Sequence, residues 1–229
     1  MRYNHHKITN FSKHASLWEK IKGNIIFAIG ITKYTRRSNF LTRYDRKKFK
    51  QNIKPADLIL IGNHRHISAF FVRGIVTHAL LYVRDKKVIH STGDGVEESS
   101  YKEIFKHYDT LIILRPKNIN EDKIKKTIDF AKKQLDKPFN YDLKQNEDHF
   151  FCTQLINSSY LEAGIDTGLP RYTNIDSILD NPLHAVKFLN DKFDIIYVSK
   201  SVRRDIKDKF KFNSEIYKNK LLKYILEKN

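Results

Sequence analysis

The chain has 229 residues, with 43 lysines and arginines, 26 aspartates and glutamates, and single copies of cysteine, methionine and tryptophan. A content of 40% hydrophobic and 30% charged residues is that of a folded globular protein and excludes global disorder. One cysteine excludes an internal disulfide and a cysteine-rich zinc site. No apolar run approaches the roughly 18 residues of a spanning helix. The expected location is the cytoplasm, with peripheral membrane contact left open.

The formal net charge is +17, and the positive residues are spread from Lys7 to Lys228. Such a distribution is typical of ordinary solvated faces, and it also fits a surface for a polyanion. No glycine-rich aromatic RNA-binding motif accompanies the charge, so nucleic acid is the disfavoured partner. The basic surface together with the apolar segment 25–31 suits an anionic membrane.

Residues 1–50 form a basic N-terminal extension in which Trp18, Ile21, Ile25 and Ile29 have the spacing of an amphipathic helix. From Lys54 onward, short apolar runs separated by turn residues predict strands. These runs are residues 58–61, 75–83, 88–90 and 110–114, followed in the second half by a strand at 194–198. A short helix is predicted at 100–107, capped by Ser99 or Ser100.

Helices dominate the second half of the chain. Asn120 caps a segment that ends before Pro138, and a second helix is predicted at 149–163, before Gly164. Further helices are predicted at 182–190 and in a basic C-terminal helical tail at 200–229. Strands followed by helices predict an α+β fold with an antiparallel sheet packed against helices.

Three residues carry candidate chemistry. Cys152 lies in the first turn of its predicted helix, where the positive end of the helix dipole favours a thiolate and lowers the thiol pKa. A lone cysteine on an apolar helix face is more often a small buried side chain. His78 lies inside one predicted strand and His90 ends the next. Together they can supply a nucleophile, a base and a group that orients the base.

The cooperation of His78 and His90 depends on the hairpin register. A two-residue loop at 85–86 would place the two histidines on opposite faces of the sheet. A three-residue loop at 84–86 pairs Val83 with Lys87 and places both histidines on one face. We predict the second register.

Six fragments in this order resemble the circularly permuted papain-like hydrolases of the NlpC superfamily, the branch with YiiX-like enzymes and relatives of lecithin:retinol acyltransferase. The fragments are PADLIL at 55–60, THALLYV at 77–83, VIHS at 88–91, LRP at 114–116, KPFNYD at 137–142 and FFCTQL at 150–155. The resemblance implies a permuted papain-like catalytic domain at 51–199. It further implies that Cys152 attacks an acyl carbon, His78 transfers the proton and His90 orients His78. It implies no cofactor and no metal.

Other polar residues have secondary roles. The backbone amide of Cys152 is the expected oxyanion donor, with Tyr141 and Gln154 as candidates for a second. Gln154 stands where many relatives carry glutamate, and Ala56 where glycine is common. Asp57 is expected to tie down a turn. His64 and His66 could suggest zinc, but a loop pair without a nearby acid is more typical of solvated side chains.

Two functions follow from the sequence. The first is a cysteine-dependent hydrolase or acyltransferase that cleaves an amide or ester of a lipid or peptide through an acyl-cysteine intermediate. The second is a non-enzymatic basic domain on a papain-like scaffold that binds nucleic acid or an anionic membrane, because a fold alone does not establish activity. The presence of the cysteine and both histidines favours the enzyme.

Overall fold

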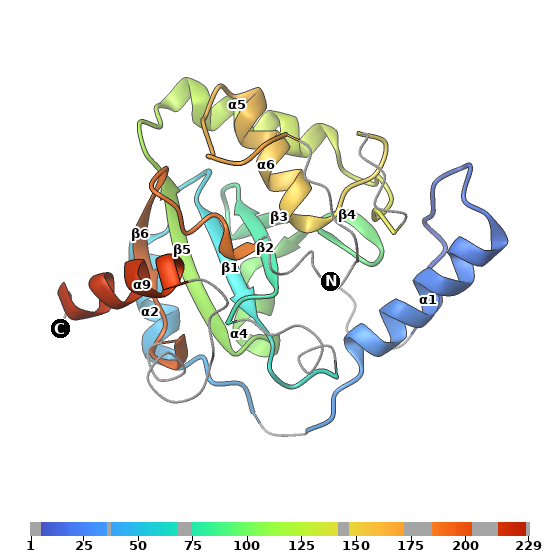
Figure 1. Cartoon of the computed structure of the whole chain (residues 1–229), viewed down its shortest axis with the longest axis horizontal. Helices are drawn as coiled ribbons and strands as arrows, with labels where there is room; N and C mark the ends of the chain where they lie inside the picture. The colour runs from blue at the N-terminus through green and yellow to red at the C-terminus, as the bar shows by residue number, and fades with distance from the viewer. Residues whose placement is uncertain are drawn as a thin grey trace.

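Six antiparallel strands form one sheet in the computed structural model, which describes residues 6–35, 38–67, 75–141, 147–171, 185–202 and 215–227. The strand order is β4-β3-β2-β1-β5-β6 (Figure 1). The strands are β1 (Leu58–Gly62), β2 (His78–Tyr82), β3 (Lys87–Thr92), β4 (Gly95–Ser100), β5 (Thr110–Pro116) and β6 (Phe193–Val198). Every neighbouring pair is antiparallel. The predicted α+β class with an antiparallel sheet is confirmed.

Helices cover both faces of the sheet because alternate residues of each strand are apolar on each side. The helices are α1 (Leu17–Ile31), α2 (Arg43–Asn52), α4 (Ile104–His107), α5 (Glu121–Lys133), α6 (Cys152–Glu162) and α9 (Glu215–Glu227), with a 3₁₀ turn at Tyr101–Glu103. One face packs with α5, α6 and α9, and the other packs with α2 and α4. No helix in the described part of the chain combines the length and apolarity needed to span a membrane.

Two elements were not predicted. Helix α2 contains only two apolar or aromatic side chains besides its charges, Tyr44 and Phe49, so its periodicity is weak. Strand β4 has the polar sequence GVEESS because it is an edge strand. Of the helix predicted at 182–190, residues 182–184 lie outside the described residues and only 185–186 are helical. The tail is helical at 200–202 and in α9, and residues 203–214 are not described.

The hairpin between β2 and β3 has the predicted register. Leu81 pairs with Ile89 and Tyr82 with Val88, and the amide of Val83 donates to the carbonyl of Lys87 over 3.1 Å. His78 and His90 therefore lie on one face of the sheet. Asp85 and Lys86 both have positive φ, at 50° and 66°, which closes the loop without a glycine.

The N-terminal extension predicted at 1–50 is not separate from the packed unit, because residue 50 falls inside α2. Phe49 is completely buried, with its ring centroid 5.0 Å from Tyr101 and 5.4 Å from Phe105. Asp45 is also buried and accepts hydrogen bonds from the Tyr197 hydroxyl (2.6 Å) and the Lys200 amide (3.1 Å). Helix α2 thus belongs to the same packed unit as β6.

The C-terminal tail is likewise packed. Leu221 and Ile225 of α9 are buried in the core on the α5–α6 face of the sheet. The Tyr224 hydroxyl donates to the carbonyl of Ile196 over 2.9 Å, which attaches α9 to β6. The domain boundaries predicted at residues 50 and 200 remain predictions, but α2 and α9 both pack against the sheet.

Candidate active site

Cys152 lies in the first turn of α6, as the sequence predicts, and it is the first residue because the helix begins three residues later than expected. Phe150 forms an isolated bridge with Phe139 and is extended, which delays the helix. The Ser91 hydroxyl on β3 donates to the carbonyl of Phe150 over 2.5 Å. The strand that carries His90 therefore fixes the start of the cysteine helix.

His78 and His90 form a direct hydrogen bond, with 2.9 Å between Nε2 of His78 and Nδ1 of His90. The second nitrogen of His90, Nε2, lies 2.8 Å from the Ser99 hydroxyl and 3.7 Å from a Glu97 carboxylate oxygen. His90 is completely buried, whereas His78 is partly exposed, with its ring stacked on Tyr108 at 6.5 Å. The polar row runs from the exposed His78 into the sheet.

One pair of tautomers in this row gives His78 a free lone pair. When His90 donates from Nε2 to Ser99 or Glu97, its Nδ1 carries a lone pair and accepts the proton of His78 Nε2. The free lone pair of His78 is then on Nδ1. A neutral imidazole with a free lone pair can act as a general base on a thiol that it reaches.

Burial keeps the His78 imidazole and the Cys152 thiol neutral. Desolvation lowers the pKa of His78 to about 4, and it raises the pKa of the Cys152 thiol to about 11. The backbone amides of Ala79, Thr153 and Cys152 itself act in the opposite direction but do not overcome it. The expectation that the helix start lowers the cysteine pKa is therefore wrong, because desolvation of the buried sulfur outweighs the dipole.

The sulfur of Cys152 contacts the backbone of Ala79, the residue after His78. Helix α6 packs on the sheet face that carries Ala79 and Leu81, while His78 points to the side of Leu80 and Tyr108. Among the contacts of these described residues, no hydrogen bond joins the sulfur to the His78 ring. The structure thus joins the two histidines directly and brings Cys152 to the neighbouring backbone.

The candidate second oxyanion donors have other partners. The Tyr141 hydroxyl donates to the carbonyl of Gly93 over 3.0 Å. The Gln154 side-chain oxygen accepts from Asn140 (3.1 Å) and from the amide of Phe151 (3.4 Å). Gln154 therefore stabilises the N-terminus of α6 from the third helical position, a role that glutamate also performs.

Asp57 and Ala56 are structural. Asp57 accepts two hydrogen bonds of 2.7 Å from Arg115 and one of 2.7 Å from the amide of Lys54, as a turn-fixing acid should. Ala56 has a φ of 62°, a region that glycine enters without steric cost. This explains why a glycine would suit the position.

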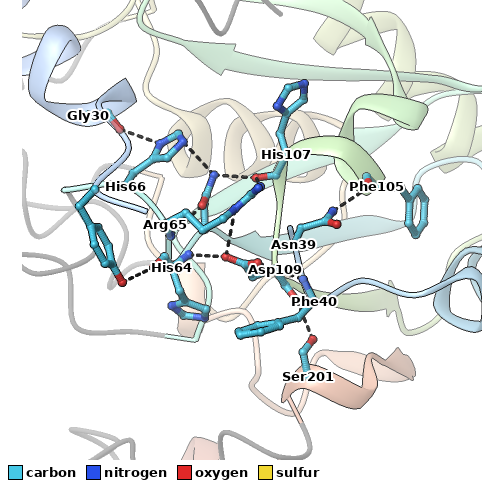
Figure 2. Close-up of polar contacts among 12 residues, drawn as sticks. Gly30, Asn39, Phe40, His64, Arg65, His66, Phe105, His107, Asp109 and Ser201 are labelled. Carbon is cyan, nitrogen blue, oxygen red and sulfur yellow. Dashed lines mark hydrogen bonds and ion pairs between the residues drawn. The ribbon is translucent and has the colours of Figure 1, made fainter. Parts of the chain in front are cut away.

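His64 and His66 belong to a second polar cluster, shown in Figure 2. His66 is buried, and its ring lies 2.9 Å from the carbonyl of Gly30 and 3.1 Å from the side chain of Asn63. The expectation of a solvated pair is wrong for His66. Burial lowers the pKa of this histidine to about 4. No group of three or more metal-ligating side chains is present in the described segments.

The same cluster holds the loop that follows β1. Asp109 is fully buried and accepts from the amides of Phe40 (3.1 Å) and His64 (2.8 Å). Arg65 donates to the carbonyl of His107 over 2.6 Å. Because Ile61 pairs with His78, this loop lies at the His78 end of the sheet.

Sequence reasoning missed the partners of His90. Ser99 and Glu97 lie on β4, which was not predicted as a strand. In the register of β3 with β4, His90 pairs with Glu97. A prediction of this register would have identified Ser99 and Glu97 as neighbours of His90. The signal was the Gly93-Asp94-Gly95 turn, which implies a returning strand.

Comparisons with known proteins agree with the predicted resemblance. The family described as "Permuted papain-like amidase enzyme, YaeF/YiiX, C92 family" matches residues 47–208. The chain is 28% identical over 113 residues to the "Probable lipoprotein peptidase YaeF" of Escherichia coli strain K12. That match covers 48% of this chain and 41% of YaeF, so it spans less than half of the relative.

Among solved structures, the chain is similar to "metalloprotein yiiX" from Escherichia coli O157:H7. The TM-score is 0.45 at 17% identity, with 67% of this chain and 93% of that chain covered. The family match covers well over half of the sequence. The chain therefore belongs to the permuted papain-like amidase family, a family of cysteine hydrolases.

Proposed function

We propose that the protein cleaves an amide or ester through an acyl-Cys152 intermediate, with His78 as the proton carrier and His90 as its positioning residue. The observation that carries the assignment is the 2.9 Å hydrogen bond between the two histidines. When His78 donates this bond from Nε2, its Nδ1 lone pair is available. The Cys152 sulfur lies against the backbone of the next residue, Ala79. The mechanism requires Nδ1 of His78 to reach the sulfur in the substrate complex, where catalytic hydrogen bonds often tighten.

The reaction has two steps. His78 Nδ1 takes the thiol proton as the sulfur attacks the acyl carbon, and the same proton then passes to the leaving nitrogen or oxygen as its bond to the acyl carbon breaks. Water, or an acceptor amine or hydroxyl, next attacks the thioester and gives its proton to His78. Breaking the carbon–sulfur bond returns a proton from His78 to the thiolate.

A neutral imidazole and a neutral thiol in the resting enzyme suit this order of steps. With the thiol pKa raised and the imidazole pKa lowered by burial, proton transfer accompanies the attack rather than preceding it. The developing oxyanion is stabilised by the backbone amide of Cys152, which lies at the first position of α6. Transfer to an acceptor other than water uses the same acyl-enzyme.

The acyl-enzyme can be trapped because Cys152 is the only cysteine. Incubation with a p-nitrophenyl ester, followed by acid quench and mass spectrometry, should show one added acyl group on the peptide that contains Cys152. Neutral hydroxylamine should remove it, since it cleaves thioesters. Acylation at lysines alone, unchanged in Cys152→Ser, would contradict the proposal.

The raised thiol pKa predicts the pH dependence of alkylation. Only the thiolate reacts with iodoacetamide, and a pKa near 11 keeps the thiolate fraction small at neutral pH. The rate constant for Cys152 should therefore keep rising with pH beyond the point at which free N-acetylcysteine levels off. Labelling that is already maximal below pH 7 would show that an ion pair with His78 exists in the resting enzyme.

His90 is expected to act through His78. His90→Leu removes the acceptor of the His78 Nε2 proton and should lower kcat by about 10²- to 10⁴-fold. His90→Gln retains a carbonyl acceptor and should recover part of this loss. Rates measured beside thermal unfolding separate the roles, because a purely structural histidine would give equal loss of activity in both variants.

A further inference from the structure

Helix α1 has an exposed apolar face that consists of Leu17, Trp18, Ile21, Ile25 and Ile29. Trp18 is 71% exposed and Ile25 is 54% exposed, although both are among the residue types that usually avoid water. Four of the five recur at intervals of three or four residues and so form one stripe. Figure 1 shows α1 at the periphery of the molecule, on the side of β4.

The opposite side of α1 is attached to the body. The side chain of Asn24 exchanges hydrogen bonds with the backbone of Ile8, at 2.8 and 3.3 Å. Gly23 lies so close to Phe11 that a Cβ there would be 2.7 Å from the ring. Phe27 leaves no room for a Cβ on Gly93, which would be 2.4 Å from its ring. The helix is thus held by its small and inward residues, and its apolar face remains outside.

The attachment points surround the candidate active site. Gly93 directly follows β3, which carries His90, and its carbonyl accepts from Tyr141 in the segment before α6. At the other end of α1, the carbonyl of Gly30 contacts His66, in the loop that follows β1. Since β1 ends where β2 begins with His78, α1 lies along the catalytic end of the sheet.

Charge indicates what covers the apolar face. Residues 6–35 contain five lysines and one glutamate, and the whole chain has a net charge of +17. Lys20 and Lys22 are exposed on α1 itself. A second copy would bring two strongly positive surfaces together, whereas an anionic lipid surface complements them. A tryptophan and isoleucine face with lysines around it is the composition of a helix that lies in a bilayer interface.

We infer that the apolar face of α1 binds an anionic lipid bilayer and presents the catalytic end of the sheet to the lipid. The substrate class that follows is an amide or ester in a lipid or a lipid-linked molecule at the membrane surface. The substrate part of this inference rests on the proposed hydrolase function. The binding part does not, because it concerns a surface that contains none of the proposed catalytic residues.

Trp18 is the only tryptophan, so its fluorescence reports on this face alone. The full chain should show a blue shift of tryptophan emission and co-sediment with vesicles of phosphatidylcholine and phosphatidylglycerol. Vesicles of phosphatidylcholine alone should bind much less. A blue shift that depends on protein concentration without vesicles would assign the face to a second copy and overturn the inference.

A matched pair of variants tests the face itself. Ile25→Glu should weaken vesicle binding by about tenfold or more, since it replaces the burial of one large aliphatic side chain with a charge. Leu226→Glu makes the same kind of exchange at a position on α9 that is even more exposed (75%) and should bind like the unaltered chain. Equal binding by both variants, or salt-sensitive binding without a tryptophan shift, would contradict insertion of α1.

Activity provides a separate measurement. Ile25→Glu should hydrolyse a soluble ester at the normal rate and lose the preference for the same acyl group in a vesicle. Cys152→Ala should bind vesicles normally. If no substrate is hydrolysed but vesicles still shift Trp18, the hydrolase proposal fails and the membrane surface stands. If the soluble ester is hydrolysed without any vesicle binding, the reverse holds.

Discussion

Cys152→Ala is expected to lower turnover by about 10⁴-fold or more, because it removes the nucleophile on which the acyl-enzyme depends. The change deletes one sulfur atom from a buried position. The backbone contacts that hold the N-terminus of α6 do not involve the sulfur atom. The free energy of unfolding should therefore fall by only about 1 kcal/mol.

Measurements of kcat on an amide or ester and of denaturant unfolding on the same preparation separate the two effects. His78→Gln is a useful companion, since it should lose turnover while Cys152 remains open to alkylation. A core role for the cysteine predicts the opposite pattern for Cys152→Ala. In that case stability would fall by several kcal/mol and residual hydrolysis would match that of the unaltered chain at equal folded concentration.

Phe49→Ala is expected to destabilise the protein by about 3–5 kcal/mol, the usual cost of emptying an aromatic position in a core. Phe49 is completely buried on the α2 face of the sheet and packs against Tyr82, Tyr101 and Phe105. Urea unfolding followed by circular dichroism measures the loss. A chain that begins at residue 51 lacks this ring and should be still less stable.

Tyr44→Ala provides the control for Phe49. Tyr44 lies on the same helix but is about half exposed, and surface substitutions usually change stability by about 0.5 kcal/mol or less. Equal and small losses for the two variants would show that α2 is an independent extension, as the sequence alone suggested. A large loss for Phe49→Ala only would establish α2 as part of the folded unit.

The buried strands were predictable because their apolar runs have no other stable environment. Residues 58–61 and 110–114 are continuous apolar runs, and they became the central β1 and β5. Strand β4 and helix α2 escaped prediction because each contributes few apolar residues. Their positions depend on tertiary partners: β4 on pairing with β3, and α2 on burial of Phe49. Hydrophobic periodicity within either segment does not identify such partners.

Part of the candidate site was predictable because it depends on local sequence. The parity of the β2–β3 hairpin determined that His78 and His90 share a face, and loop length is a local property. The pKa of the cysteine was not predictable, because it depends on how completely segments distant in the sequence desolvate the sulfur. The contribution of Ser99 required the β3–β4 register.

The Asp45 contacts have a consequence for the order in which the chain folds. Asp45 caps α2 through Thr42, a local interaction that forms early, but its other oxygen accepts from Tyr197, 152 residues later. During synthesis α2 emerges long before its partner on β6, so its final docking awaits nearly the whole chain. Long-range closure of this kind slows folding and leaves incomplete chains open to aggregation and proteolysis. The α2 face of the sheet should accordingly be the last to gain protection from hydrogen exchange in a refolding experiment.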